Sequence, residues 1–377
     1  MQREGAWVPR GDFSPTHRPV NFDRQLATAV AAGLRLPRLA CGLLLDEEPL
    51  RPGPARQMPT RKGQRVRRER SPVGAAGKSF LKTSPWIRVQ AEVHQAHELR
   101  LPLIQRLEQH YDAKVYTFFT SFTNEQSQIT DKDAEMLESV LAVEHQGERL
   151  LLVLSSPGGD ALAAERIVNV CRSYSEGKFE VLVPHMAKSA ATMICFGAST
   201  IHMSRTSELG PVDPQVPYQD DLGATRWISA QEYVRSYDKL VGRASGGGPK
   251  RIEPYLQQLN RYDARFIEGL LSAQRLSEDI SVRLLRSGML NGQSEKRIRQ
   301  AIDFFLRQER TSSHGRMINL EGVRQCRLRV EEIDLRSEVW ETVWELYVRY
   351  DWAVSNVATK VIESAKSSVH VAAPRVS

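Results

Sequence analysis

Short segments rich in aliphatic, β-branched and aromatic residues alternate in this chain with segments whose apolar residues recur at helical spacing. One of them, 150–154, is apolar without interruption, which is typical of a strand that is buried on both faces of a sheet. Three others, at 115–119, 179–183 and 200–203, also predict strands. Three neighbouring segments predict helices, at 130–145, 161–174 and 189–197. Strands that alternate with helices predict an α/β fold with a largely parallel central sheet.

Further helices are expected around this core. Apolar spacing predicts helices over 87–111 and 295–308, and one long helix or two consecutive ones over 252–285. The polar stretch 216–250 is expected to be a loop insertion with some helix. Residues 335–365 are rich in tryptophan and other large apolar residues, and they predict an amphipathic helix that packs on the core or on a sister subunit.

The positive charge of the chain is concentrated near its N-terminus. The formal net charge is +7, yet residues 1–90 carry 17 basic and 7 acidic side chains, whereas the remaining residues carry 35 and 38. The same 90 residues hold 10 of the 19 prolines. Proline and arginine at this density leave too little apolar surface to offset the entropy lost on ordering, so we expect residues 1–88 to be a mostly disordered tail.

This basic tail has one simple interpretation and several functional ones. It is most simply a solvated extension. It could also contact nucleic acid or an anionic membrane surface by charge alone, act as a targeting segment, or reflect a wrongly assigned start. The chain has no uninterrupted span of about 20 apolar residues and no clean apolar run near Met1. We therefore expect a cytoplasmic protein.

The cysteines argue against two kinds of structural cross-link. Cys41, Cys171, Cys195 and Cys326 form no C-x-x-C pair. This pattern favours neither a disulfide framework nor a structural zinc site, and it fits a reducing compartment. We expect neither a metal nor a cofactor.

Two short segments could carry chemistry. The first, Ser155-Ser156-Pro157-Gly158-Gly159, lies where a predicted strand ends and a helix begins. Proline presets one dihedral angle, and the two glycines permit positive φ and close approach of the backbone to a ligand. Backbone N–H groups at such a turn can converge on an anion or on a developing oxyanion. Taken alone, the segment is more simply an ordinary turn.

The second segment runs from Val183-Pro184-His185 to Ser189-Ala190-Ala191-Thr192, also at a strand-to-helix junction. Small residues around Ser189 suit a helix start that is buried close to other backbone. There the hydroxyl could face a cleft, and the N–H groups of the helix start could stabilise negative charge. An N-cap or simple small-residue packing is the structural alternative.

Two more segments follow in the sequence, and the order of all of them resembles that of a known family. After the two segments comes Leu209-Gly210-Pro211-Val212-Asp213-Pro214-Gln215, and a weaker match begins at His314 and leads into Glu321-Gly322-Val323. Over about 95–335 the chain resembles the serine dehydrogenase proteinase family of the Clp protease/crotonase-like superfamily. That family is similar to signal peptide peptidase A and to the Clp proteolytic subunit.

The resemblance implies a ClpP/crotonase-like ββα-spiral core and a serine protease domain over 89–335, followed by a C-terminal helix and tail over 336–377. It places the nucleophile on Ser189 and the oxyanion hole at Gly158, Gly159 and Ala190. Two departures are visible: Ala191 stands where glycine is more usual, and Lys188 directly precedes the nucleophile. We expect the Lys188 side chain to face solvent.

The sequence leaves the general base open. A serine hydroxyl needs a base within hydrogen-bond reach. A Ser-His-Asp triad would use His314 with Asp334 as its partner, whereas a Ser-Lys dyad would use Lys250. Lys239 and His185 are poorer candidates, and the base could also be absent.

Three functions fit these residues. The leading one is a serine-type endopeptidase that cleaves a peptide or protein substrate through an acyl-enzyme. Clefts of this type are usually built in oligomers, so we expect a homo-oligomer. The second is a crotonase-type acyl-CoA enzyme, which would need carboxylates in the cleft, and Asp160 is the only acid beside the glycine turn. The third is a catalytically inactive scaffold.

Overall fold

The computed structural model describes residues 96–219, 224–246, 252–306 and 317–372. All of them fall within one compact unit, Ala75–Ser377. The predicted tail, 1–88, lies outside the described residues. So do the two leading candidates for the general base, Lys250 and His314.

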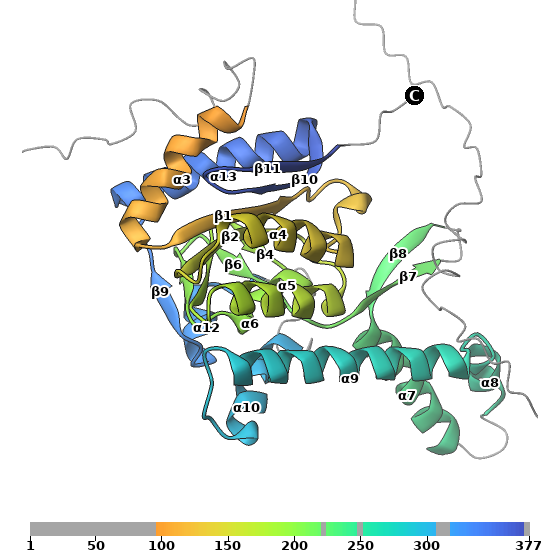
Figure 1. Ribbon diagram of the computed structural model, residues 1–377. Helices are drawn as coiled ribbons and strands as arrows, with labels where there is room; N and C mark the ends of the chain where they lie inside the picture. The colour runs from red at the N-terminus through yellow and green to blue at the C-terminus, as the bar shows by residue number, and fades with distance from the viewer. Residues whose placement is uncertain (1–95, 220–223, 247–251, 307–316, 373–377) are drawn as a thin grey trace, which may run out of the picture. The chain divides into compact units, whose positions relative to one another are not determined.

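A seven-stranded sheet forms the centre of this unit (Figure 1). Its strands follow the order β11-β10-β1-β2-β3-β5-β9. Their bounds are β11 Ser368–Ala372, β10 Ala358–Glu363, β1 Lys114–Thr120, β2 Leu150–Ser155, β3 Phe179–Val183, β5 Ile201–Met203 and β9 Val330–Glu332. The neighbours from β1 to β9 are parallel, whereas β10 pairs antiparallel with both β1 and β11. The predicted α/β fold with a largely parallel sheet is confirmed.

Helices cover both faces of the sheet, and the strand β2 contributes side chains to the hydrophobic core on each face. Successive side chains of a strand point to opposite faces. Leu150, Leu152 and Leu154 belong to one hydrophobic cluster, whereas Leu151 and Val153 belong to the other. An uninterrupted apolar run is therefore what a strand in this position requires.

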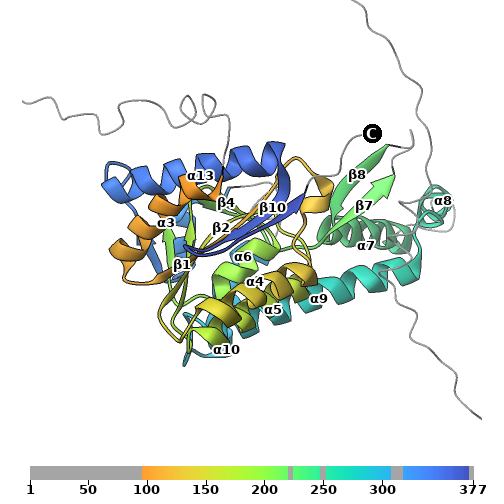
Figure 2. The ribbon, with the colours of Figure 1, turned by 45° about the horizontal axis from the view of Figure 1, so that its top comes forward.

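The two helical layers can be followed in Figures 1 and 2. On the first face lie α4 (Asp131–Glu144), α5 (Ala161–Tyr174) and α6 (Ala190–Gly197), with α9 (Ala264–Ser287) and α10 (Glu295–Leu306) packed beyond them. On the second face lie α3 (His97–Tyr111) and α13 (Glu338–Asn356). The same unit contains the short elements η1 Glu125–Ser127, β4 Met186–Ala187, β6 Glu208–Leu209 and α12 Leu320–Gln325.

Local sequence explains where several helices begin. A capping box of Thr130 and Asp133 starts α4, and in it the Asp133 carboxylate accepts the Thr130 N–H at 2.7 Å. The expectation of one or two helices over 252–285 resolves as two, α8 (Glu253–Leu259) and α9. The Asp263 carboxylate marks the start of the second, because it caps α9 by accepting two backbone N–H groups.

The polar insertion contains more regular structure than its sequence predicts. Residues 215–229 form an antiparallel hairpin of β7 (Gln215–Gln219) and β8 (Thr225–Ser229), and α7 (Ala230–Gly246) follows directly. The prediction of a loop with some helix missed this hairpin. Cross-strand backbone bonds define its short strands, and such bonds leave only a weak signal in the residue types.

The C-terminal helix is shorter than predicted. It ends at Asn356 rather than continuing to residue 365, and β10 and β11 follow it into the sheet. The predicted packing on the core is confirmed, since Trp340, Val343 and Tyr347 are buried against the second face. The extension to 365 was wrong because the β-branched residues of 357–362 satisfy a helical apolar pattern while they favour a strand.

A buried ion pair fastens β10 to α3. The Arg100 guanidinium donates to both carboxylate oxygens of Glu363, at 2.8 and 2.6 Å, and neither side chain is exposed. Tyr350 donates to the same carboxylate at 2.6 Å. Burial alone would raise the pKa of Glu363, but hydrogen bonds from Arg100 and His370 outweigh it and hold that pKa far below its usual range.

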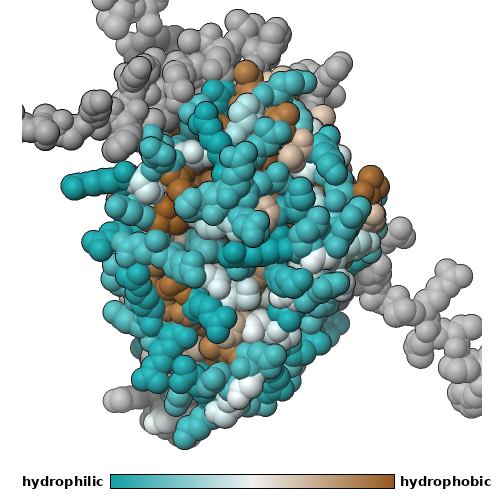
Figure 3. Space-filling model, turned by 60° about the vertical axis from the view of Figure 1, so that its left-hand side comes forward, coloured by the Kyte–Doolittle hydropathy of each residue, from teal (hydrophilic) through white to brown (hydrophobic). Residues whose placement is uncertain are grey.

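The surface adds two observations. Figure 3 shows one side of the molecule as mostly hydrophilic, with apolar side chains confined to narrow patches. Within the described ranges, no helix combines the length and the apolar character that a membrane crossing requires.

Candidate active site

Ser189 occupies a strained turn between β4 and α6. Its backbone has φ 50° and ψ −119°, and the N–H of Ala191 donates to the C=O of Lys188 at 2.9 Å. These values match the first central position of a type II′ turn, which glycine normally occupies. Holding a serine there costs about 1–3 kcal/mol, and such strain clusters at functional sites.

A buried threonine holds this turn against the third motif. Thr192 Oγ1 lies 2.7 Å from the C=O of Ala187 and 3.0 Å from the C=O of Gly210, and it accepts the Gly210 N–H at 3.1 Å. The backbone ladder between β4 and β6 runs alongside. The Ser189 motif and the 209–215 motif are therefore parts of one local structure.

Lys188 does not face solvent, contrary to our expectation. Its Nζ lies 2.9 Å from Glu208 Oε1 and donates to the C=O of Leu209 at 3.3 Å, and the side chain is only 12% exposed. The sequence did not reveal the partner, because Glu208 lies 20 residues further along the chain and meets Lys188 only through the β4–β6 pairing.

The glycine turn is bonded directly to the serine turn. The Ser156 N–H donates to the C=O of Met186, and its C=O accepts the N–H of Lys188, each at 3.0 Å. The next residues pair with the segment before α4: Ile129 donates to the C=O of Gly158, and Asp160 donates to the C=O of Ile129, each at 2.8 Å. The two Ser156 bonds bring the glycine turn and the serine turn, which are 30 residues apart in the sequence, into one site.

Only glycines fit the positions of the turn. Gly158 has φ 106°, and a Cβ built there would lie 2.6 Å from the backbone oxygen of Lys188 and 2.7 Å from Ser189 Cβ. A Cβ built on Gly159 would lie 2.3 Å from the backbone nitrogen of Ile129. The backbone at Gly158 therefore packs directly on the serine turn.

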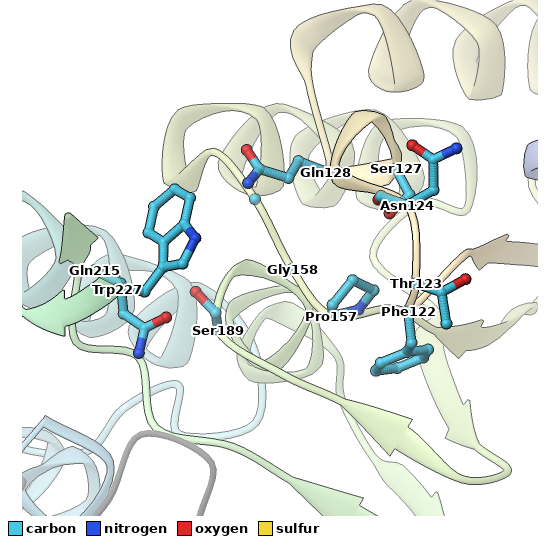
Figure 4. Close-up of a pocket in the computed structure, with 11 residues that line it drawn as sticks. Phe122, Thr123, Asn124, Ser127, Gln128, Pro157, Gly158, Ser189, Gln215 and Trp227 are labelled. Carbon is cyan, nitrogen blue, oxygen red and sulfur yellow. Dashed lines mark hydrogen bonds between the residues drawn. The ribbon is translucent and has the colours of Figure 1, made fainter. Parts of the chain in front are cut away.

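Ser189 and the paired glycines open onto one pocket of about 480 Å³. Figure 4 shows Ser189 between Trp227 on one side and Pro157 and Phe122 on the other. The remaining side chains of the described lining carry hydroxyl or carboxamide groups: Thr123, Asn124, Ser127, Gln128 and Gln215. No lining residue in the described ranges has an acidic, basic or imidazole side chain.

The sequence analysis missed most of this lining. Trp227 lies on β8, in the segment expected to be a loop, and its side chain is 52% exposed. Phe122 follows β1 and is 38% exposed. The β-branched and aromatic residues of 225–228 are the local signal that could have indicated a strand there.

None of the described candidate bases lines this pocket. His185 Nδ1 lies 3.0 Å from the Tyr347 hydroxyl, and burial lowers the pKa of His185. Lys239 lines a separate hollow beside α7 and α8. Asp334, the expected triad partner of His314, is exposed and accepts the backbone N–H of the residue two positions further along.

Comparison with known proteins supports the class that this geometry indicates. A parallel α/β sheet that sets a serine turn against a paired-glycine turn is consistent with a ClpP-like protein. Residues 80–230 match the family described as ClpP-like SDH-type serine proteinase. This match covers about two fifths of the chain and includes all three central motifs. The resemblance to the serine dehydrogenase proteinase family is confirmed over those residues.

The individual relatives match a smaller part of the chain than the family does. Two uncharacterized proteins of Methanocaldococcus jannaschii are 33% and 34% identical over 88 residues, which is 23% of this chain. The chain spans only 30% of the length of each. A solved structure of a mutant membrane-bound stomatin-specific protease has 21% identity and a TM-score of 0.23, and the match covers 34% of this chain and 64% of that one.

Proposed function

We propose that this protein is a serine-type endopeptidase with Ser189 as its nucleophile. The observation that carries the proposal is the strained turn, which holds the Ser189 side chain in a pocket against the paired glycines. The hydroxyl oxygen attacks a peptide carbonyl while a base accepts its proton. The C–N bond then breaks, the amine leaves with a proton, and water hydrolyses the resulting ester.

The oxyanion hole is proposed to consist of the N–H groups of Gly159 and Ala190. The Gly158 N–H already donates to Ser156 Oγ at 3.1 Å. Because the Gly158 C=O accepts from Ile129, the Gly159 N–H of the same peptide plane points away from Ile129. Among the described residues, neither this N–H nor that of Ala190 has a hydrogen-bond acceptor.

The position of Ala190 at the start of α6 supports its N–H as the second donor of the oxyanion hole. Ala190 is the first residue of this eight-residue helix, and a Cβ built on Gly158 would lie 3.0 Å from its nitrogen. The partial positive charge of a helix start favours a developing negative charge nearby. Gly158 contributes by lacking a side chain, which lets its backbone approach the nucleophile.

The general base is proposed to be His314 or Lys250, as the sequence left open. No described residue of the pocket lining carries a side chain that accepts a proton at neutral pH. The same described lining offers no carboxylate for the acyl-CoA alternative.

The test is covalent labelling of the purified full-length chain with a fluorophosphonate probe. We expect labelling of the wild type and none of Ser189→Ala. The control Ser199→Ala, which removes a hydroxyl that donates to the C=O of Phe179, should label like the wild type. Separate His314→Ala and Lys250→Ala variants identify the base, because loss of the essential one abolishes labelling. A wild type that stays unlabelled, or a Ser189→Ala variant that labels normally, would refute the proposal and favour an inactive scaffold.

A further inference from the structure

We propose that Thr120 and Ser156 are a positioning pair that determines which backbone N–H of the glycine turn faces the reacting carbonyl. This inference rests on the proposed function. Neither side chain lines the serine pocket, so neither is a catalytic residue. Both act through the conformation of the turn.

The two side chains meet deep in the protein. Thr120 ends β1 and Ser156 directly follows β2, the neighbouring parallel strand, so both lie at the carboxyl end of the sheet. Thr120 Oγ1 donates to Ser156 Oγ at 2.8 Å, and that oxygen also accepts the Gly158 N–H at 3.1 Å. Thr120 is 1% exposed and Ser156 is not exposed, so water does not compete for these bonds.

Hydrogen bonds fix both peptide planes that flank Gly158. The Ser156 hydroxyl holds the Gly158 N–H, which orients the plane between Pro157 and Gly158. The Ile129 N–H holds the Gly158 C=O, which orients the plane between Gly158 and Gly159. Since the C=O and N–H of a trans peptide point in opposite directions, the Gly159 N–H is then directed away from Ile129.

The pair is needed because glycine resists conformational change weakly. Gly158 adopts φ 106°, and glycine populates positive and negative φ about equally. The bond from Thr120 holds the Ser156 hydroxyl in the rotamer that faces the Gly158 N–H. Without it, the Ser156 hydroxyl can turn away from the Gly158 N–H, and the first plane can rotate. Only the bond from Ile129 would then hold Gly158 in place, and the Gly159 donor would be less firmly positioned. Small displacements of such a donor cost large factors in rate.

Substitutions at Thr120 separate positioning from packing. Thr120→Val keeps the volume and removes the donor to Ser156, whereas Thr120→Ser keeps the hydroxyl and removes a methyl. The matched control is Thr117→Val on the same strand, because Thr117 is fully buried and its hydroxyl binds Tyr350. We expect Thr120→Val to slow labelling at saturating probe by about ten- to a hundredfold, with little change in probe affinity. Thr120→Ser and Thr117→Val should label at nearly the wild-type rate.

Amide hydrogen exchange, followed by NMR, gives a measurement that does not depend on the probe. We expect the Gly158 amide to be protected in the wild type and to exchange about tenfold faster or more in Thr120→Val. Should Thr120→Val not fold, Ser156→Ala removes the acceptor itself and should give the same two results. Equal Gly158 exchange in the wild type and the variant overturns the inference.

The two proposals fail in different ways. If the wild type reacts through Ser189 but Thr120→Val reacts as fast, only the positioning inference fails. If Ser189 does not react at all, the proposed function fails, and hydrogen exchange at Gly158 decides whether Thr120 and Ser156 still orient the turn.

Discussion

Replacing Gly158 with alanine should both destabilise the protein and slow the reaction of Ser189. The new Cβ would lie 2.6 Å from the Lys188 backbone oxygen and 2.7 Å from Ser189 Cβ. Neither contact can be relieved by a flexible side chain. We expect the left-handed conformation to cost about 1–2 kcal/mol and the overpacking about 1–3 kcal/mol more. The free energy of unfolding should therefore fall by about 2–5 kcal/mol.

The chain contains a matched control for the backbone part of this cost. Gly177 has φ 82°, and a Cβ there would meet no atom within 4 Å. It precedes β3, at the end of the sheet opposite the glycine turn. Gly177→Ala should cost only the conformational part, about 1–2 kcal/mol, and should label at the wild-type rate.

Urea unfolding and fluorophosphonate labelling test both parts of the reasoning. Relief of the clash at Gly158 must move the backbone of Ser189, so we expect labelling of Gly158→Ala to fall by about a hundredfold or more. The reasoning is refuted if Gly158→Ala and Gly177→Ala are equally stable and Gly158→Ala labels normally.

Two further predictions concern stability. The free energy of unfolding of Ser189→Gly, measured in urea, should exceed that of Ser189→Ala by about 1 kcal/mol, because glycine relieves the strain at φ 50°; equal stability would show that the turn is unstrained. Glu363→Gln should destabilise the protein by about 3–5 kcal/mol at neutral pH, because the buried Arg100 guanidinium loses the charge of its bidentate partner. Because folding lowers the pKa of Glu363, the wild-type contribution is complete above the ordinary value of 4.5 and is lost as the pH falls below it. The difference in unfolding free energy between the wild type and Glu363→Gln should therefore shrink between about pH 5 and pH 3, and a constant difference would contradict the assigned cause.

The predictions that succeeded depended on local patterns. A strand that is buried on both faces must be apolar at every position, as in 150–154, and the capping box of Thr130 and Asp133 marks a helix start within four residues. The glycine turn and Ser189 were also visible locally, because glycine and small residues suit the tight turns that the structure shows. That these motifs meet in one site could only be inferred from a resemblance.

The errors occurred where distant segments determine the local structure. Residues 357–362 fit a helical apolar pattern, yet they form a strand because β1 offers an edge for pairing and Arg100 binds Glu363. Trp227 lines the pocket because it lies on the β7–β8 hairpin. The backbone pairing of that hairpin is only weakly indicated by the types of residue in its strands.

Sequence alone thus determined which segments are buried and which turns can adopt positive φ, because these properties belong to neighbouring residues. Tertiary structure decided which of those segments meet. It set Glu208 beside Lys188 and Gly158 against Ser189. The physical reason is that the closeness of two segments depends on the packing of the whole sheet and its helices, which no short stretch of residues specifies.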